Sequence, residues 1–292
     1  MNEKKLKVVV LTHGGANRLL ELLHAMETVE VAGVFVETAA APQRSFKQKL
    51  ERSVRYDGYA ATLKKFSATL LGGATKGAAE LEAVREGQRE LDELARSLSI
   101  PLYRVENYHA ETAIDLLRKT NADLGIVFGT NIIKESVFGI PRLGSINLHQ
   151  GLAPFYRGGP TVFWELFNDE KELGITIHFV VARVDTGDII LQKTLPLDYD
   201  FARYDLDFER FLADYRTSLT EPSTELLAEA VRLISIGQEK RTPQDTSLGK
   251  RNRLPLKKEK DELRRRLRAP KRVFESGQLR AKGALRVKAS SV

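Results

Sequence analysis

Residues 6–36 read LKVVVLTHGGANRLLELLHAMETVEVAGVFV, and this stretch decides the fold class. The run Leu6–Thr12 is apolar and rich in β-branched residues, as a fully buried strand is, and it stops at Gly14-Gly15. Leucines then recur at helical spacing over residues 17–26, and residues 29–36 form a second apolar run. A buried strand, a turn, a helix and another buried strand predict a parallel α/β sheet.

The alternation of strands and helices continues along the chain after one interruption. Residues 45–99 are rich in Leu, Ala, Lys, Arg and Glu at spacings of three and four, which predicts a helical insertion broken at Gly72-Gly73. The sequence GGATKG at this break lacks the GK[ST] ending of a phosphate-binding loop, so it indicates a turn. Further strands are expected at 102–105 and 124–128, and further helices at 110–119, 204–216 and 221–236.

Length and composition exclude several classes of protein. The chain has 292 residues, of which 42% are hydrophobic, so we expect one large domain or a domain with an appendage. The absence of cysteine excludes a disulfide scaffold, a thiolate zinc site and a cysteine nucleophile. The apolar runs are too short to span a bilayer, and the first one reads as a strand, not a signal peptide. We therefore expect a cytoplasmic protein with no membrane partner.

Positive charge is concentrated at the end of the chain. Residues 240–292 hold 18 Lys/Arg and 5 Asp/Glu, a net charge of +13, whereas the whole chain is +7 and residues 1–239 are therefore −6. A basic tail indicates contact with nucleic acid, a phosphorylated substrate or an acidic surface, but a solvated helix over Lys257–Arg268 with a disordered end from residue 271 has the same pattern. We divide the chain into a catalytic domain (1–200), a helical extension (201–239) and a basic, partly disordered tail (240–292).

The polar residues with chemical potential lie in and after residues 144–151, GSINLHQG. Strand alternation places Asn147 and His149 on one face, about 6–7 Å apart, near the carboxyl end where parallel sheets bind ligands. An amide donor beside an imidazole suits the stabilisation of an oxyanion and the movement of a proton near neutral pH.

Two segments downstream add a cation and a carboxylate. The Gly- and Pro-rich stretch GLAPFYRGGP (151–160) predicts a rigid, exposed loop in which Tyr156 and Arg157 offer an anionic substrate a partner. Asp185 lies in a turn after the strand expected at 174–181, where it could face His149 and favour its charged form. The alternatives are a His149 satisfied in the core and an Asp185 that only shapes its turn, because spacing alone does not bring these residues together.

Four motifs resemble the folate-dependent formyltransferase family, which includes the glycinamide ribonucleotide, methionyl-tRNA and sugar N-formyltransferases. They are Asn147-Leu148-His149, GLAPFYRG (151–158), GITIH (174–178) and VDTGDII (184–190), with weaker similarity at FGTNII (128–133) and the first strand. The resemblance covers roughly residues 1–40 and 100–200. It implies a Rossmann-like, mostly parallel sheet with a helical insertion and a helical, basic C-terminal extension.

The resemblance also implies the chemistry. The formyl donor would be 10-formyltetrahydrofolate, with no metal, and Asn147, His149 and Asp185 would be catalytic. His149 as imidazolium and the Asn147 amide would stabilise the oxyanion that forms when an amine attacks the formyl carbon, while Asp185 would hold His149 charged and help to remove the amine proton.

The binding residues implied by the resemblance fall into three groups. The pterin pocket would be lined by the loop after the fourth strand and by the segment 181–187, and its residues would be Phe128, Gly129, Thr130, Asn131, Ile132, Val184 and Gly187. Gly14, Gly15 and Asn17 occupy the place where the purine-pathway members bind substrate phosphate, although the Gly-Ser pattern of those members is incomplete here. Tyr156 and Arg157 would stand near the acceptor.

The acceptor is the least constrained part of the prediction. Residues 200–292 lack the short alternating strands of the barrel that methionyl-tRNA formyltransferases carry, and the stretch Pro160 to Trp164 resembles the sugar enzymes. We therefore expect an amine on a small molecule, such as an amino-sugar nucleotide or glycinamide ribonucleotide. The alternatives are methionyl-tRNA formylation aided by the basic tail, hydrolysis of formyltetrahydrofolate, a non-catalytic nucleic-acid-binding protein on this scaffold, and a tail used for protein assembly.

Overall fold

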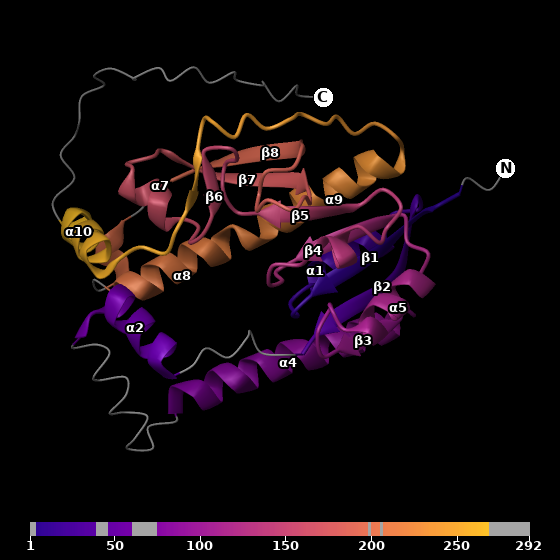
Figure 1. Cartoon of the computed structure of the whole chain (residues 1–292), viewed down its shortest axis with the longest axis horizontal. Helices are drawn as coiled ribbons and strands as arrows, with labels where there is room; N and C mark the ends of the chain where they lie inside the picture. The colour runs from indigo at the N-terminus through magenta and orange to yellow at the C-terminus, as the bar shows by residue number, and fades with distance from the viewer. Residues whose placement is uncertain (1–3, 39–45, 60–74, 198–199, 205–206, 269–292) are drawn as a thin grey trace.

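A central sheet organises the computed structural model, which describes residues 4–38, 46–59, 75–197, 200–204 and 207–268 (Figure 1). Within these residues seven strands pair in the order β3-β2-β1-β4-β5-β7-β8. Their bounds are β1 (Leu6–Thr12), β2 (Val29–Glu37), β3 (Leu102–Val105), β4 (Leu124–Phe128), β5 (Ser145–His149), β7 (Glu172–Phe179) and β8 (Ile189–Pro196). The pairs from β3 to β5 are parallel, and β7 is antiparallel to both β5 and β8. The predicted mostly parallel α/β sheet is confirmed.

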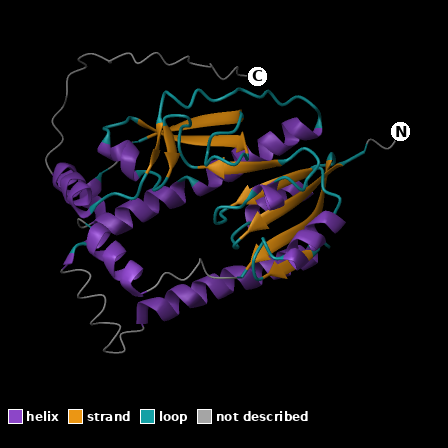
Figure 2. Ribbon diagram, viewed as in Figure 1, coloured by secondary structure: helices purple, strands orange, loops and turns teal. Residues whose placement is uncertain are grey.

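Helices cover both faces of this sheet (Figure 2). They are α1 (Asn17–His24), α2 (Phe46–Asp57), α4 (Thr75–Ser97), α5 (Glu111–Lys119), α6 (Glu135–Phe138), α7 (Phe163–Phe167), α8 (Phe208–Ser218), α9 (Thr220–Ser235) and α10 (Lys257–Arg268), with a 3-10 turn at Phe201–Tyr204. The β-branched run of β1 alternates between two cores: Val8 and Val10 pack with α1, α4 and α9, and Val9 and Leu11 pack with α5 and α6. Because both faces are buried, the middle of β1, Val8–Leu11, is apolar at every position.

The insertion has the helical character that its composition predicts. Helices α2 and α4 occupy residues 46–57 and 75–97. The break expected at Gly72-Gly73 lies outside the described residues. A third apolar cluster, formed by α7, β7, α8 and Leu263 of α10, supports the other end of the sheet.

The first part of the basic segment is packed against the rest of the protein. From the end of α9 the chain runs back across the molecule to α10 (Figure 1), and we call residues 239–256 the return segment. Its short strand β9 (Lys250–Asn252) pairs in parallel with β6 (Tyr156–Gly158), and Thr242 bridges to Ile189. The predicted helix over Lys257–Arg268 is confirmed as α10. Residues 271–292, expected to be disordered, lie outside the described residues.

Several cations of this region have partners inside the molecule. The Arg241 guanidinium lies 3.9 Å from the centre of the Phe179 ring. Arg266 donates to the Phe167 carbonyl at 2.9 Å, and Arg264 pairs with Glu209 at 3.1 Å. Part of the positive charge therefore holds the C-terminal region in place. Among the described residues, none of the helices has the length and apolarity needed to cross a bilayer.

Candidate active site

The pairing of β5 with β7 brings the first two polar side chains together. In this antiparallel register Asn147 is the direct partner of His178, and His149 is the partner of Thr176. Asn147 Nδ2 lies 3.3 Å from His178 Nε2. Asn147 lies toward the carboxyl end of β5, beside β4. The strand order reverses between β1 and β4, and α/β sheets bind ligands outside the carboxyl ends of their strands near such a point.

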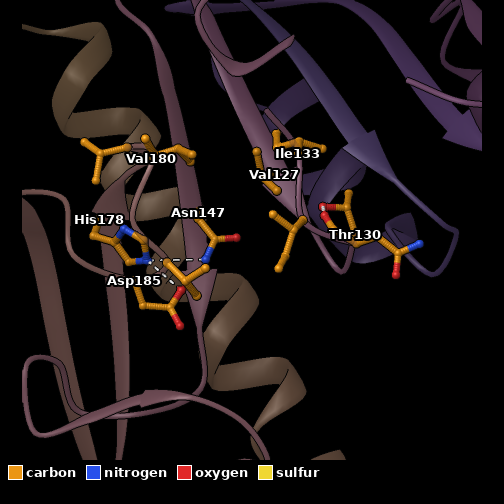
Figure 3. Close-up of a pocket in the computed structure, with 12 residues that line it drawn as sticks. Val127, Thr130, Ile133, Asn147, His178, Val180 and Asp185 are labelled. Atoms are coloured by element: carbon orange, nitrogen blue, oxygen red, sulfur yellow. Dashed lines mark hydrogen bonds and ion pairs between the residues drawn. The ribbon is translucent and has the colours of Figure 1, made fainter. Parts of the chain in front are cut away.

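Asp185 contacts both His149 and His178, and Figure 3 shows it beside His178. Its Oδ1 is 3.5 Å from His178 Nε2, and its Oδ2 is 3.5 Å from His149 Nδ1. The Gly158 amide donates to the same Oδ2 at 2.8 Å. The three residues predicted to be catalytic, Asn147, His149 and Asp185, are thus gathered in one cluster, and His178 links Asn147 to the carboxylate.

The backbone of Asp185 is held in an unusual conformation. Its φ is +52°, in the left-handed region that Asp adopts more readily than most residues but still at a cost of about 1–3 kcal/mol. The hydrogen bond that the Gly158 amide donates to the carboxylate offsets part of that cost. Strain of this kind concentrates at functional sites, because a side chain must be aimed in a direction that relaxed backbone does not permit.

Hydrogen bonds define the proton positions on the two rings. His149 Nε2–H donates to the Tyr156 carbonyl at 2.7 Å, so its Nδ1 faces Asp185. His178 Nδ1–H donates to the Phe179 carbonyl at 2.8 Å, which leaves Nε2 to accept from the Asn147 amide. His178 therefore fixes the orientation of the Asn147 side chain.

Burial and charge shift the pKa values in this cluster. Burial lowers the pKa of His149, and the neighbouring Asp185 charge and the Tyr156 carbonyl oppose this only in part. Burial acts to raise the pKa of Asp185, but its close approach to His178, the positive charge that His149 gains when protonated and the Gly158 amide lower it to about 2. Asp185 thus favours the charged form of His149, as expected, while desolvation of the ring, only 8% exposed, favours the neutral form and lowers the pKa overall.

A cavity of about 200 Å³ opens beside the cluster (Figure 3). Apolar side chains form most of its wall, and Asn147, His178 and Asp185 form its polar side. Its lining residues are Val127, Thr130, Asn131, Ile132, Ile133, Asn147, His178, Val180, Val181, Ala182, Val184 and Asp185. His149 is absent from this lining and lies behind Asp185, with which it is in contact.

The residues predicted for the pterin pocket divide into two groups. Thr130, Asn131, Ile132 and Val184 line the cavity. The other three residues do not line the cavity and instead shape the backbone, namely Phe128, Gly129 and Gly187. Phe128 is buried at the end of β4, Gly129 turns the chain with φ +66°, and a Cβ on Gly187 would collide with the Phe179 carbonyl oxygen.

The predicted phosphate loop lies apart from this cavity. Gly14 and Gly15 have positive φ values of +131° and +70°, and the Gly14 amide donates to Thr12 Oγ1 at 3.0 Å. Asn17 begins α1, and its buried Oδ1 has no protein partner. The three residues follow β1, on the same edge of the sheet as the loop after β4, and none of them lines the cavity.

The loop expected to be an exposed anion-binding segment has a different role. The Tyr156 carbonyl accepts from His149, and its hydroxyl donates to Glu170 at 2.6 Å. The expectation of an exposed cation is wrong for Arg157, which is 4% exposed and donates to the Pro154, Thr246 and Gly249 carbonyls. The sequence pattern did not predict the burial of Arg157, because two of its acceptors lie about ninety residues away in the return segment.

Replacing Arg157 with alanine should lower the free energy of unfolding by about 2–4 kcal/mol, because three carbonyls lose a charged donor inside the protein. Urea unfolding measures this loss, and limited proteolysis should show earlier cleavage in the return segment. The control is Arg183→Ala, at an exposed position, which should change stability by less than about 0.5 kcal/mol. Equal stability of the two variants would contradict the structural role of Arg157.

Gly151 is required by the packing around His149. A Cβ at this position would overlap His149 Nε2 and lie 2.6 Å from the Tyr156 carbonyl oxygen. Gly151→Ala should therefore destabilise the protein by about 1–3 kcal/mol and displace the imidazole. Gly87→Ala on α4, where the added Cβ meets open space, should instead stabilise by roughly 0.5–1 kcal/mol. Thermal unfolding of both variants tests the opposite signs.

His178 is the site residue that sequence reasoning missed. It lies within the GITIH motif, but its role depends on the antiparallel β5–β7 register, which strand periodicity does not specify. Among the described residues, no group of three or more His, Asp or Glu is arranged to hold a metal ion.

Comparison with known proteins agrees with this geometry. The sequence profile of the formyl transferase family matches residues 6–207, so the chain belongs to the formyl transferase family. A methionyl-tRNA formyltransferase from Parabacteroides distasonis is 39% identical over 103 residues, which are 35% of this chain and 32% of that protein. One from Syntrophus aciditrophicus is 33% identical over 171 residues, 58% of this chain and 51% of that protein. The chain thus matches about a third to a half of the length of these relatives.

A solved structure shares the fold over more of its length. The phosphoribosylglycinamide formyltransferase from Anaplasma phagocytophilum has a TM-score of 0.52 and 21% identity, and the match covers 80% of this chain and 89% of that chain. At this level of identity the likeness concerns the fold alone.

Proposed function

We propose that this chain transfers a formyl group from 10-formyltetrahydrofolate to an amine on a small molecule. The observation that carries the proposal is the meeting of Asn147, His178 and Asp185 on the polar side of a mostly apolar cavity, in a chain of the formyl transferase family. Acyl transfer to an amine requires a hydrogen-bond donor for the oxyanion and groups that accept a proton. The Asn147 amide is suited to the first role, and the Asp185 carboxylate with the His149 imidazole behind it is suited to the second.

The lining of the cavity supports a folate ring system as its occupant. Val127, Ile133 and Val180 present apolar surfaces to a flat heterocycle, while the segment after β4 offers polar groups at Thr130 and Asn131. The donor supplies the formyl carbonyl, on which negative charge develops as the amine attacks. We propose that this carbonyl lies next to the polar side of the cavity, formed by Asn147, His178 and Asp185.

Asn147 is the proposed donor to that developing charge. Its Nδ2 has two hydrogens, and only one is used by His178 at 3.3 Å. The other is free for an oxyanion in the cavity. His178 acts as a positioning residue, since its own Nδ1–H is committed to the Phe179 carbonyl.

Asp185 and His149 are the proposed path for the proton that the amine loses. Asp185 lines the cavity and remains ionised, because its pKa is lowered to about 2. His149 rests neutral with Nδ1 directed at the carboxylate, so a proton passed by Asp185 is held on Nδ1 in an ion pair. Nε2–H stays on the Tyr156 carbonyl throughout. When the tetrahedral intermediate collapses, the bond between the formyl carbon and N10 of the donor breaks, and the proton held on Nδ1 returns through Asp185 to N10, so that tetrahydrofolate leaves as the free amine.

The acceptor is proposed to be an amino-sugar nucleotide or glycinamide ribonucleotide. The stretch Pro160 to Trp164, which resembles the sugar enzymes, supports a small acceptor. Methionyl-tRNA is the second candidate, favoured by the names of the relatives matched in sequence. Water as acceptor would give a hydrolase from the same residues.

An acceptor screen tests the proposal. The full chain is incubated with 10-formyltetrahydrofolate and one acceptor at a time, and tetrahydrofolate release is followed by absorbance. The acceptors are glycinamide ribonucleotide, 3- and 4-amino-sugar nucleotides and charged initiator tRNA, with buffer alone for hydrolysis. We expect turnover with one small amine that is abolished in Asn147→Ala.

Other outcomes of the screen overturn the proposal. If only charged tRNA supports turnover, the acceptor is tRNA and not a small amine. If turnover occurs equally in buffer alone, the acceptor is water. No turnover with any acceptor, combined with strong salt-dependent retention of RNA, replaces the enzyme with a nucleic-acid-binding protein that uses the basic segment.

A further inference from the structure

The segment that forms one wall of the cavity is anchored by two histidines outside the catalytic cluster. Residues 129–134 follow β4 without regular secondary structure. Near the middle of this segment the Asn131 amide donates to His13 Nε2 at 3.2 Å, and at its end the Lys134 amide donates to His109 Nε2 at 3.0 Å. His13 follows β1 and His109 follows β3, so two other loops hold the stretch between these amides.

Each ring is oriented by a second bond that fixes its proton. His13 Nδ1 donates to the Glu37 carbonyl at 3.2 Å, and His109 Nδ1 donates to Asn107 Oδ1 at 3.0 Å. In both cases Nδ1 carries the hydrogen and Nε2 is left as the acceptor of a backbone amide. Only the neutral ring satisfies both bonds.

From this arrangement we infer that neutral His13 and His109 position residues 131–134 for donor binding, and that protonation of the two rings releases this wall of the cavity. The inference rests on the proposed function, because it takes the cavity as the donor site. Asn131, Ile132 and Ile133 lie between the two anchors and line the cavity.

Protonation of His13 and His109 removes their hydrogen bonds to the Asn131 and Lys134 amides. An imidazolium carries hydrogen on both nitrogens, so its Nε2–H would point at the N–H of Asn131 or Lys134 and the bond would be lost.

The charged groups around each ring differ. His13 Nε2 lies 3.6 Å from Glu37 Oε2, so a charged His13 exchanges its backbone partner for an ion pair. The other oxygen of Glu37 is held by the Tyr108 amide at 3.0 Å. His109 contacts the neutral Asn107 side chain and the backbone of Lys134, with Glu111 two residues along the chain. The side chain of His13 is about one-third exposed, so a proton has access to it.

The experiment compares three kinds of variant across pH 5.5–8. In the double variant His13→Gln/His109→Gln, each glutamine offers an oxygen that accepts the amide but does not titrate. The double variant His13→Ala/His109→Ala has no acceptor. His24→Gln, at an exposed position in the last turn of α1, is the matched control. The readouts are the KM for 10-formyltetrahydrofolate, kcat, and hydrogen exchange of the Asn131 and Lys134 amides.

We expect the KM of the wild type and of His24→Gln to rise about tenfold as pH falls, which corresponds to the loss of two hydrogen bonds. The Gln double variant should keep a flat KM profile, and the Ala double variant should have the high KM at every pH. Values of kcat should be alike in all four proteins at a given pH. Exchange of the two amides should follow the same pattern when proteins are compared at equal pH.

The inference is overturned if the Gln double variant keeps the wild-type pH dependence of KM, or if the Ala double variant exchanges the two amides as slowly as the wild type. Hydrogen exchange needs no folate. A protein that shows the exchange pattern but no formyl transfer would therefore contradict the proposed function and leave the anchoring intact.

Discussion

Replacing Asp185 with asparagine should slow formyl transfer by about 10²- to 10⁴-fold while the fold is retained. Asparagine tolerates the left-handed conformation at φ +52° and keeps an oxygen that can accept from the Gly158 amide. What it removes is the negative charge that faces His149 and His178. The measurement is kcat under saturating donor, beside a circular dichroism spectrum that reports the fold.

The residual activity should also show a shifted pH profile. The Asp185 charge opposes the effect of burial on His149, so its removal lowers the pKa of His149 further. If neutral His149 accepts the proton, kcat rises with pH as the ring loses its own proton. A lower pKa of His149 should therefore move this acidic limb of the kcat profile to lower pH in Asp185→Asn. The control is Asp188→Asn in the same loop, for which we expect a normal rate and profile. A limb that stays in place, or moves to higher pH, contradicts the proposed coupling.

Asp185 should also contribute to acid stability in a defined window. Its pKa is about 2 in the folded protein against an ordinary 3.8, so its stabilisation is fully present above about pH 4 and is lost as pH falls through about 2. The shift corresponds to about 2 kcal/mol. Urea unfolding between pH 5 and pH 2 should show this loss in the wild type and not in Asp185→Asn.

The parts of the fold that the sequence predicts are those with local causes. The run Val8–Leu11 is apolar at every position because β1 is buried on both faces, and this is visible without any partner. Asn147 and His149 share a face of β5 because alternation is a property of one strand. Position at the carboxyl end of that strand then suffices to nominate them as site residues.

The parts that could not be predicted depend on distant partners. His178 joins the site through the β5–β7 register, and Arg157 is buried by the Thr246 and Gly249 carbonyls. His13 and His109 carry no motif, and their roles depend on backbone amides in a loop about 118 and 25 residues further along the chain. The neutral state of His149 likewise depends on its burial, which adjacent sequence does not reveal.

Removal of the His149 ring is expected to abolish transfer without affecting the donor site. His149 contacts Asp185 but does not line the cavity, so a variant should bind the donor and fail to accept the proton. His149→Ala should lower kcat by about 10²- to 10⁴-fold and leave the dissociation constant for 5-formyltetrahydrofolate, a non-reacting analogue, within about twofold. Calorimetric titration and single-turnover rates separate the two effects.

The alanine variant also loses packing, and a second variant keeps the test independent of that loss. The ring is 8% exposed, and its removal leaves the Tyr156 carbonyl without its donor, which should destabilise the protein by about 1–3 kcal/mol. His149→Gln can still donate to that carbonyl but cannot take up a proton near neutral pH. Both variants should therefore be inactive although their stabilities differ, since proton uptake on Nδ1, and not the volume of the ring, is what the reaction needs. A folded His149→Gln protein that transfers formyl at the wild-type rate would remove His149 from the mechanism and leave Asp185 as the base.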